Sequence, residues 1–487
     1  MQRRDVLRGL TGLGLLSLPG TARAGQSSYG PLGSVEINDS KEAVMGPDNE
    51  TAFVAAGSGF ATVDVSNPSA PTVLAERRDL LADRENGPMV NILDIKVHGD
   101  RLLVPGPGNA QEDEVFTGFV LYDVSDPADP VQAGVYEAPG PIHNAFVTDE
   151  TAYLTQGPSI AIVDVRGDDP TEVGKFSITD FDGKWSDVNI FLRNPHDVWV
   201  QGQTAYVPMW DAGTWIVDVS DPAAAEPLGH VQARPFEELA AVQFDETQEE
   251  TQQLPGNHHY AQPSRDGRLL AIGKESWDFS RTDDSGGPGG IELWDISTPD
   301  SPIKLSEIPP PRAADETRSG TWTTSHNFDV VGDRLYTSWY QGGVKIYDIS
   351  RPSNPKELAW WRKPDVGAFW TAKRATADFF IASSVGDFVS PVVSEALFTF
   401  PTAPGEQADP PETPNESGTP SGFATPRPTP TPTPTPTPSP TPSPTPSPTA
   451  AESTPETDSG GQPGFGVLGA LTGIAGARWV LKRGNGD

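Results

Sequence analysis

Short runs of β-branched and aromatic residues alternate with Gly, Asp and Pro along residues 31–401, which is typical of strands joined by tight turns. One ten-residue pattern, an apolar run that ends in Asp with a Pro four residues later, recurs without a gap at residues 59–68, 118–127, 213–222, 290–299 and 343–352. A copy two residues longer lies at residues 159–170. A second apolar run precedes each copy and a third follows the Pro, so we predict a meander in which this Asp ends the third strand. A following Ser or Asp can bond its own backbone and Pro presets the turn, so we interpret the Asp column as structural.

The spacing of the copies predicts a β-propeller. Successive aspartates of the pattern are separated by 41 to 77 residues, in the range of four-stranded propeller blades. Six copies give six blades, and residues 379–384 and 395–400 supply two strands of a degenerate seventh. Its missing outer strand is predicted at the start of the chain, because residues 32–35 (LGSV) resemble residues 228–231 (LGHV) at the outer position of the fourth copy. We therefore expect an all-β fold of seven four-stranded blades over residues 31–401, closed by this N-terminal strand.

These segments resemble the LVIVD repeat, and the resemblance covers most of residues 31–401. It implies a repeat-built propeller of the kind found in surface proteins of haloarchaea. A second similarity is purely architectural and links the expected fold to the selenium-binding protein and methanethiol oxidase family, propellers with histidines in their channel. That similarity implies a metal-dependent enzyme as an alternative function. It assigns no role to any individual residue of this chain.

Four histidines occupy one position of the predicted blade. His143, His196 and His326 each lie ten residues before the Tyr that anchors the second strand, and His259 lies eleven residues before Leu270. This position, at the start of the innermost strand, is expected beside the central channel. The other three blades have at this position Ala43, Leu93 and Trp370. Three interpretations stay open: the histidines bond the backbone of a neighbouring blade, some of them hold a divalent transition metal, or the channel binds an anion or small polar ligand.

The long loops are predicted on the same face as the histidines, because they join consecutive blades or the second and third strands of one blade. Loops on a rigid scaffold often carry function, so this face is the expected binding surface. The aromatic residues that follow second strands are candidate ligand-binding residues for sugars or peptides, with the core as their alternative place: Trp210, Trp277, Trp339 and Tyr340. The acidic insertion 236–253 lacks the ligand order of an EF-hand, which favours a solvated loop.

The two ends of the chain have the composition of targeting segments. Residues 1–24 contain paired arginines, an apolar run and small residues, which resembles a twin-arginine signal peptide. Residues 402–462 are rich in Pro, Thr and Ser, which predicts a disordered, extended stalk. Residues 463–487 hold Pro-Gly-Phe, a short apolar helix and a basic end, which resembles the PGF-CTERM tail processed by an archaeosortase; an ordinary membrane anchor is the alternative. Three N-glycosylation sequons fit a surface glycoprotein, at Asn38, Asn49 and Asn415.

Charge and composition narrow the function classes. The chain of 487 residues has 67 acidic and 34 basic residues, a net charge of −33, and no cysteine. Such a surface repels nucleic acid and is suited to hydration in concentrated salt, where charge repulsion is screened. Without Cys, the chain has no disulfide, thiolate nucleophile or cysteine metal site. The sequence also contains no nucleophile elbow, phosphate loop, dinucleotide fingerprint or His-Glu-x-x-His motif.

We therefore expect a monomeric, secreted protein that is anchored at the outer cell surface, in the membrane and surface layer. There it acts as a binding or scaffolding module for envelope components or for a small-molecule or glycan ligand. Two alternatives stay open. One is a metal-dependent enzyme that uses the histidine column, and the other is a purely structural component of the envelope.

Overall fold

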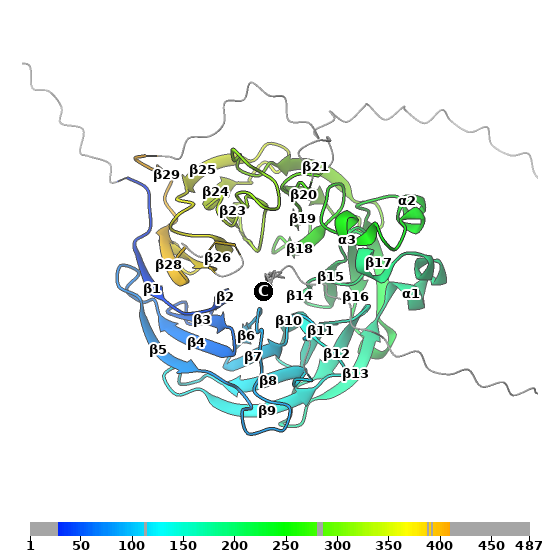
Figure 1. The fold of residues 1–487 in the computed structure, drawn as a ribbon, viewed down its shortest axis with the longest axis horizontal. Helices are drawn as coiled ribbons and strands as arrows, with labels where there is room; N and C mark the ends of the chain where they lie inside the picture. The colour runs from blue at the N-terminus through cyan, green and yellow to red at the C-terminus, as the bar shows by residue number, and fades with distance from the viewer. Residues whose placement is uncertain (1–27, 112–113, 280–285, 387–388, 391–392, 410–487) are drawn as a thin grey trace, which may run out of the picture.

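In the described part of the chain, seven sheets form a closed ring, and one edge strand of each sheet lies nearest the ring axis (Figure 1). The sheets are antiparallel apart from one short added strand. The computed structural model describes residues 28–111, 114–279, 286–386, 389–390 and 393–409. It confirms the prediction of an all-β, seven-bladed propeller with mostly four-stranded blades. The predicted signal peptide, most of the stalk and the C-terminal tail lie outside the described residues.

The blades are numbered in chain order, each from its innermost to its outermost strand. Blade 1 consists of β2 (Ser40–Met45), β3 (Thr51–Ala56), β4 (Gly59–Asp64) and β5 (Thr72–Arg77). Blade 2 consists of β6 (Lys96–His98), β7 (Arg101–Gly106), β8 (Gly118–Asp123) and β9 (Val131–Glu137). Blade 3 consists of β10 (Ile142–Val147), β11 (Thr151–Gln156), β12 (Ser159–Asp164) and β13 (Thr171–Phe176). Blades 4 and 5 are β14 (Trp199–Gln201), β15 (Thr204–Pro208), β16 (Thr214–Asp218), β17 (Glu226–Val231); and β18 (His258–Pro263), β19 (Leu269–Lys274), β20 (Ile291–Asp295), β21 (Ile303–Ile308). Blade 6 consists of β22 (Asp329–Val331), β23 (Arg334–Ser338), β24 (Val344–Asp348), β25 (Lys356–Trp361) and β29 (Gly405–Glu406). Blade 7 consists of β26 (Phe369–Arg374), β27 (Phe379–Ser384), β28 (Ala396–Pro401) and β1 (Gly33–Glu36).

The N-terminal strand β1 closes the ring, as predicted. It pairs antiparallel with β28, from Gly33 opposite Thr399 to Glu36 opposite Ala396. Its likeness to β17 of blade 4 has a physical basis. A Cβ on Gly33 would lie 2.7 Å from the carbonyl oxygen of Pro68, in the turn of the next blade. In β17, glycine likewise lets the turn of the next blade approach the outer strand closely.

The repeated Asp is structural, as the sequence indicated. In five blades its Oδ1 accepts a hydrogen bond from the backbone N–H of the Ser two residues later, at distances of 2.8 or 2.9 Å; the pairs are Asp64–Ser66, Asp123–Ser125, Asp218–Ser220, Asp295–Ser297 and Asp348–Ser350. In blade 3 the donor is the N–H of Arg166, which bonds Asp164. The carboxylate thereby fixes the turn that leads to the outer strand.

Neighbouring blades share their apolar core. Phe60 of blade 1 packs edge-on against Tyr122 of blade 2, with 4.9 Å between ring centroids. Tyr260 of blade 5 packs in the same way against Phe328, which leads into blade 6, at 4.7 Å. Because interiors pack closely, these contacts fix how far each blade stands from the ring axis.

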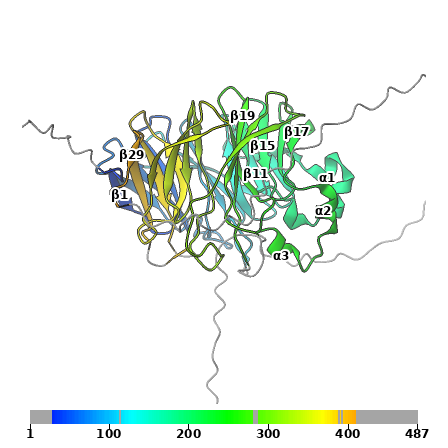
Figure 2. The same cartoon turned by 90° about the horizontal axis from the view of Figure 1, so that it is seen from above.

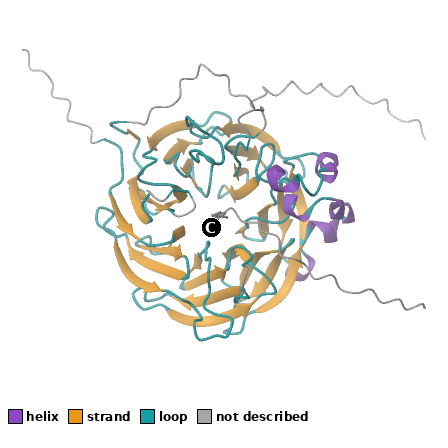
Figure 3. Cartoon of the chain, in the orientation of Figure 1, coloured by secondary structure: helices purple, strands orange, loops and turns teal. Residues whose placement is uncertain are grey.

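The outer edge carries features that the sequence analysis did not predict. β29 adds a fifth, parallel strand to blade 6, and the Glu406 carbonyl accepts from the Tyr29 N–H at 2.9 Å. Three short α-helices and two 3₁₀ helices lie near blade 4 (Figures 2 and 3), namely α1 (Ile178–Phe181), η1 (Gly183–Asp187), η2 (Ile190–Leu192), α2 (Phe236–Ala241) and α3 (Thr247–Glu250). α1 and α2 lie at the outer edge of the ring, whereas α3 lies closer to the ring axis (Figure 1). A third 3₁₀ helix, η3 (Pro222–Ala224), forms the turn before β17. The acidic insertion is thus not a plain solvated loop, since it forms α2 and α3 and buries Leu239. Among the described residues, no helix has the length and apolarity needed to cross a bilayer.

Candidate functional site

The ring brings the four predicted histidines together at one end of its axis. Ring centroids are 4.4 Å apart for His143 and His196, and 3.8 Å apart for His196 and His259. His259 and His326 follow at 4.5 Å. Each histidine belongs to the start of a different blade, from blade 3 to blade 6, so the row exists only in the closed ring. Trp370 of blade 7 continues it, 4.1 Å from His326.

Blade 1 contributes a different residue to this position than expected. The turn between β2 and β3 has five residues, 46–50, whereas the turn between β10 and β11 has three, 148–150. Two extra residues shift the register, so that Phe53 pairs with Val44 and the position equivalent to His143 is taken by Lys41. The expectation of Ala43 was therefore wrong by two residues.

Hydrogen bonds from the histidines to the backbone determine which ring nitrogen is left for a ligand. Nδ1 of His143 lies 2.8 Å from the Gly108 carbonyl oxygen, and Nδ1 of His326 lies 2.6 Å from that of Trp370. Nδ1 of His196 contacts the carbonyl oxygen of His259 at 3.1 Å. A carbonyl only accepts, so each Nδ1 must carry the proton. In the neutral imidazole, Nε2 is then the nitrogen with a free lone pair.

Glu275 completes the group, and sequence reasoning missed it. It directly follows β19, and one carboxylate oxygen lies 3.2 Å from Nε2 of His259. The other oxygen accepts from the Tyr340 hydroxyl at 2.5 Å. Ligand atoms of His196, His259 and Glu275 all lie within 4.8 Å of one another, and all three residues are buried. The available signal was an acidic residue at the end of the second strand in a blade whose first strand begins with histidine.

Burial sets the charges of this group. It is the largest cause that lowers the pKa of His196 well below its usual value, and the neighbouring imidazoles add to it. Burial likewise lowers the pKa of His326 to about 3. For Glu275, burial is the largest single effect and favours the neutral acid, but His259, His326 and the Tyr340 hydrogen bond together outweigh it and lower the pKa to about 2. At neutral pH the carboxylate is therefore ionised beside neutral imidazoles of His196 and His326, the protonation states that metal ligands need.

Nδ1 of His259 differs from the other three Nδ1 atoms of the row. Nδ1 of His259 is buried and makes no hydrogen bond to the described part of the chain. Buried polar atoms are nearly always paired, so an orphan at this place indicates a group that reorganises when a ligand arrives. A metal on Nε2 would displace the proton that now faces Glu275 and leave Nδ1 to carry it. The residues present therefore fit a metal ion bound by two imidazoles and one carboxylate.

The four predicted aromatic ligand residues, Trp210, Trp277, Trp339 and Tyr340, are all buried. In this conformation they do not form an exposed platform for a sugar. Trp210 stands edge-on to His196 at 4.7 Å, and Tyr340 stands edge-on to His326 at 5.0 Å, so these two wall the histidine row. Trp339 lies apart from the row, in the core between blades 5 and 6.

A second polar layer lies beside the histidines on the innermost strands, and it was not predicted. Glu42 accepts from Asn327 Nδ2 at 2.8 Å, which links blade 1 to blade 6. Asp94 pairs with Lys96 and also accepts from the backbone N–H of Ala145, which links blade 2 to blade 3. Because these charged groups bond mainly to one another and to neighbouring blades, we interpret this layer as a structural tie of the ring.

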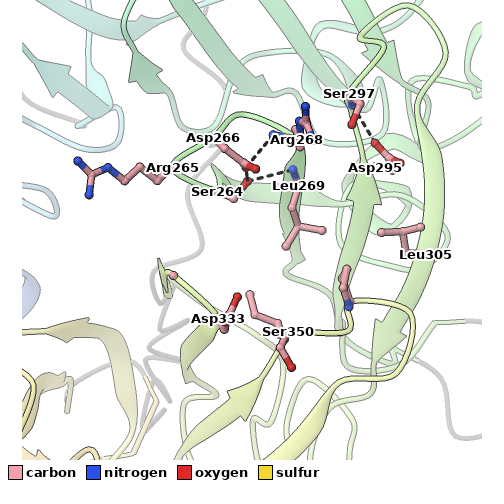
Figure 4. A pocket seen from close by; sticks show the side chains of 13 residues that line it. Ser264, Arg265, Asp266, Arg268, Leu269, Asp295, Ser297, Leu305, Asp333 and Ser350 are labelled. Carbon is pink, nitrogen blue, oxygen red and sulfur yellow. Dashed lines mark hydrogen bonds between the residues drawn. The ribbon is translucent and has the colours of Figure 1, made fainter.

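The opposite face of the ring has an open hollow of about 500 Å³ between blades 5 and 6 (Figure 4). Turn residues line it, and several of their polar groups already bond to one another. Asp266 accepts from Ser264 Oγ at 2.6 Å, and Asp295 accepts from the Ser297 N–H. The hollow is thus a gap between two turns, and the histidine end is the better candidate site.

Comparison with known proteins agrees with this architecture. The family model of the LVIVD repeat matches residues 51–76 and 193–231, and no curated protein sequence matches the chain. The chain is similar to the solved β-propeller domain of Cps50 (Swd1) from Myceliophteria thermophila, at 10% identity and a TM-score of 0.50, over 76% of this chain and 99% of that one. It is also similar to the WD40 repeats of RRP9, at 10% identity and a TM-score of 0.52, over 77% of this chain and 97% of that one. At such low identity the likeness shows the fold alone. The chain is an LVIVD repeat-containing seven-bladed β-propeller.

Proposed function

We propose that this protein is an exported binding module that holds a divalent transition metal at the histidine end of its ring. One observation carries the proposal: the ligand atoms of His196, His259 and Glu275 lie within 4.8 Å of one another in a buried setting. Two imidazoles with one carboxylate suit Zn²⁺, Cu²⁺ or Ni²⁺ better than Ca²⁺ or Mg²⁺, which prefer oxygen ligands.

The backbone bonds of the histidines support this function instead of competing with it. Nδ1 of His196 is used to tie blade 4 to blade 5, and that bond orients the ring and leaves Nε2 for a metal. His143 and His326 flank the three proposed ligands and can orient groups that approach them. Three protein ligands leave a coordination position for a further ligand, as expected of a site that binds something through its metal.

The proposed place of action is the outer cell surface. The twin-arginine-like start, the Pro/Thr-rich stalk and the PGF-CTERM-like tail support export, processing by an archaeosortase and anchoring at the envelope of a salt-adapted archaeon. The partners we propose are envelope components or a small ligand. Digestion of intact cells with an external protease tests the location: release of the propeller supports it, and full protection contradicts it.

Metal content tests the site. Full-length protein purified without chelators should contain one transition-metal ion per chain. His196→Ala removes one imidazole ligand, and Glu275→Gln replaces a charged carboxylate by a neutral, weaker amide oxygen, so each should reduce that content severalfold or more. His230→Ala is the matched control, since His230 bonds the Ala212 carbonyl outside the row and its loss should leave the metal in place. Wild-type protein that takes up no metal, even when zinc or copper is supplied, contradicts the proposal.

A further inference from the structure

The guanidinium of Arg318 lies over two neighbouring indole rings beside the proposed metal site. The Cζ of Arg318 lies 4.3 Å from the ring centroid of Trp277 and 4.7 Å from that of Trp322. The backbone of Arg318 is fixed as well. Its N–H donates to the Asp278 carbonyl at 2.8 Å, and its own carbonyl accepts from Nε1 of Trp322 at 2.8 Å. The position of the charge is therefore built into the loop between blades 5 and 6.

Two N–H donors of this stack lack an acceptor in the part of the chain that the structure describes. Nη1 of Arg318 and Nε1 of Trp277 are both buried, and neither has a hydrogen-bond partner among the described residues. Trp277 is only 1% exposed, so its indole N–H lies away from bulk solvent. An unpaired buried N–H is costly, and more so on a charged group. Because both orphans are donors, the group that satisfies them must be an acceptor.

The stack adjoins the proposed metal ligands. Trp322 packs edge-on against Tyr340 at 5.4 Å, and the Tyr340 hydroxyl donates to Glu275. Arg318 is close enough for its charge to matter there, since Glu275 raises the pKa of Arg318 against the larger lowering effect of burial. The orphan donors and the histidine row thus share one end of the ring.

We propose that Arg318 and Trp277 form a subsite for a small anion that only accepts hydrogen bonds, such as a carboxylate group or a halide. Nη1 of Arg318 supplies charge and one hydrogen bond, and Nε1 of Trp277 supplies a neutral second one. The inference rests on the proposed function only in that a metal nearby would offset the negative charge of Glu275. The anion should therefore bind metal-free protein and bind metal-loaded protein more tightly.

Calorimetric titration tests the subsite with sodium acetate and sodium chloride as separate probes. The full-length protein is used in buffer of constant ionic strength, with and without added zinc. We expect binding of one anion per chain to the wild type, and a loss of about tenfold or more in affinity for Trp277→Phe and Arg318→Gln, because each removes a hydrogen bond to a charged group. Trp277→Phe keeps an aromatic ring for stacking, so the fold should tolerate it.

Trp339→Phe is the matched control. Trp339 is equally buried, but its Nε1 already donates to Thr337 Oγ1 at 2.7 Å, so this variant should bind the anion as the wild type does. Binding of acetate alone or of chloride alone supports the subsite and identifies the class of anion. Absence of binding to the wild type, or equal binding by Trp277→Phe, overturns the inference. The metal-free titration separates this result from the proposed function, because the subsite can bind an anion there even if no metal binds.

Discussion

His196 and His326 each donate from Nδ1 to a backbone carbonyl of the following blade, so each ring has a fixed orientation and a fixed tautomer. From the sequence, backbone bonding and metal binding were alternatives, because one histidine column fits either. In the structure the two roles are compatible, because Nδ1 bonds the backbone and Nε2 is left for a metal. Glu275 could not be predicted in the same way. Its approach to His259 depends on the path of the chain just after β19, and the repeated sequence pattern does not include the residue at that position.

At His230 the structure predicts a pH dependence of folding. Its ring stacks on Trp215 at 4.3 Å, and burial lowers its pKa to about 4, although the hydrogen bond to the Ala212 carbonyl opposes the shift. The unfolded state therefore takes up this proton first as the pH falls. The stability that His230 contributes is complete above about pH 6.5 and is lost as the pH falls toward 4.

Urea unfolding at pH 7, 5.5 and 4 measures this effect. His230→Phe keeps an aromatic ring on Trp215 but cannot titrate, so its free energy of unfolding should fall less steeply with acid than that of the wild type. Gly183→Ala is the control, because its Cβ would meet nothing within 4 Å and it changes no titratable group, so the slope should stay unchanged. Equal slopes for the wild type and His230→Phe would show that the buried imidazole does not govern acid sensitivity.

Among the structural elements, the strands and their turns were predictable, and the insertions were not. Alternating apolar residues and the turn from Asp to Pro repeat in every clear blade, with Arg166 in place of Ser in blade 3, so their common physical causes are visible in the sequence. α2 and α3 occur once, inside an acidic segment whose composition also suits a loop. β29 is two residues long and depends on a neighbouring contact with Tyr29, which local patterns do not record.

The contact between an outer strand and the next blade's turn gives a prediction at this scale. A Cβ on Gly229 would lie 1.7 Å from the carbonyl oxygen of Pro299, closer than any real contact allows. Gly229→Ala must push blades 4 and 5 apart and should lower the free energy of unfolding by about 1–3 kcal/mol, as overpacking does. Gly183→Ala, whose Cβ would meet nothing within 4 Å, should be nearly neutral in the same urea titration. A Gly229→Ala variant as stable as Gly183→Ala would show that the blades can separate freely.

On the scale of the whole molecule, closure of the ring creates the site. His143 and His326 are separated by 183 residues, yet His196 and His259 join them into one continuous row. Repeat counting could place the four histidines at one depth of four consecutive blades. It could not supply the distances between them, because these depend on the number of blades and on the packing that fixes the radius of the ring. Lys41 shows the limit of repeat counting, because the longer turn between β2 and β3 places it, and not Ala43, at the position equivalent to His143.

X-ray absorption at the metal edge of the reconstituted full-length protein tests the central claim most directly. The structure predicts a first shell that contains two imidazole nitrogens and a carboxylate oxygen, at about 2.0–2.2 Å for zinc. His196→Ala should remove one imidazole from that shell, and the control His230→Ala should leave it unchanged. A shell of oxygen atoms alone, or one that His196→Ala does not change, would contradict a metal centre built from His196, His259 and Glu275.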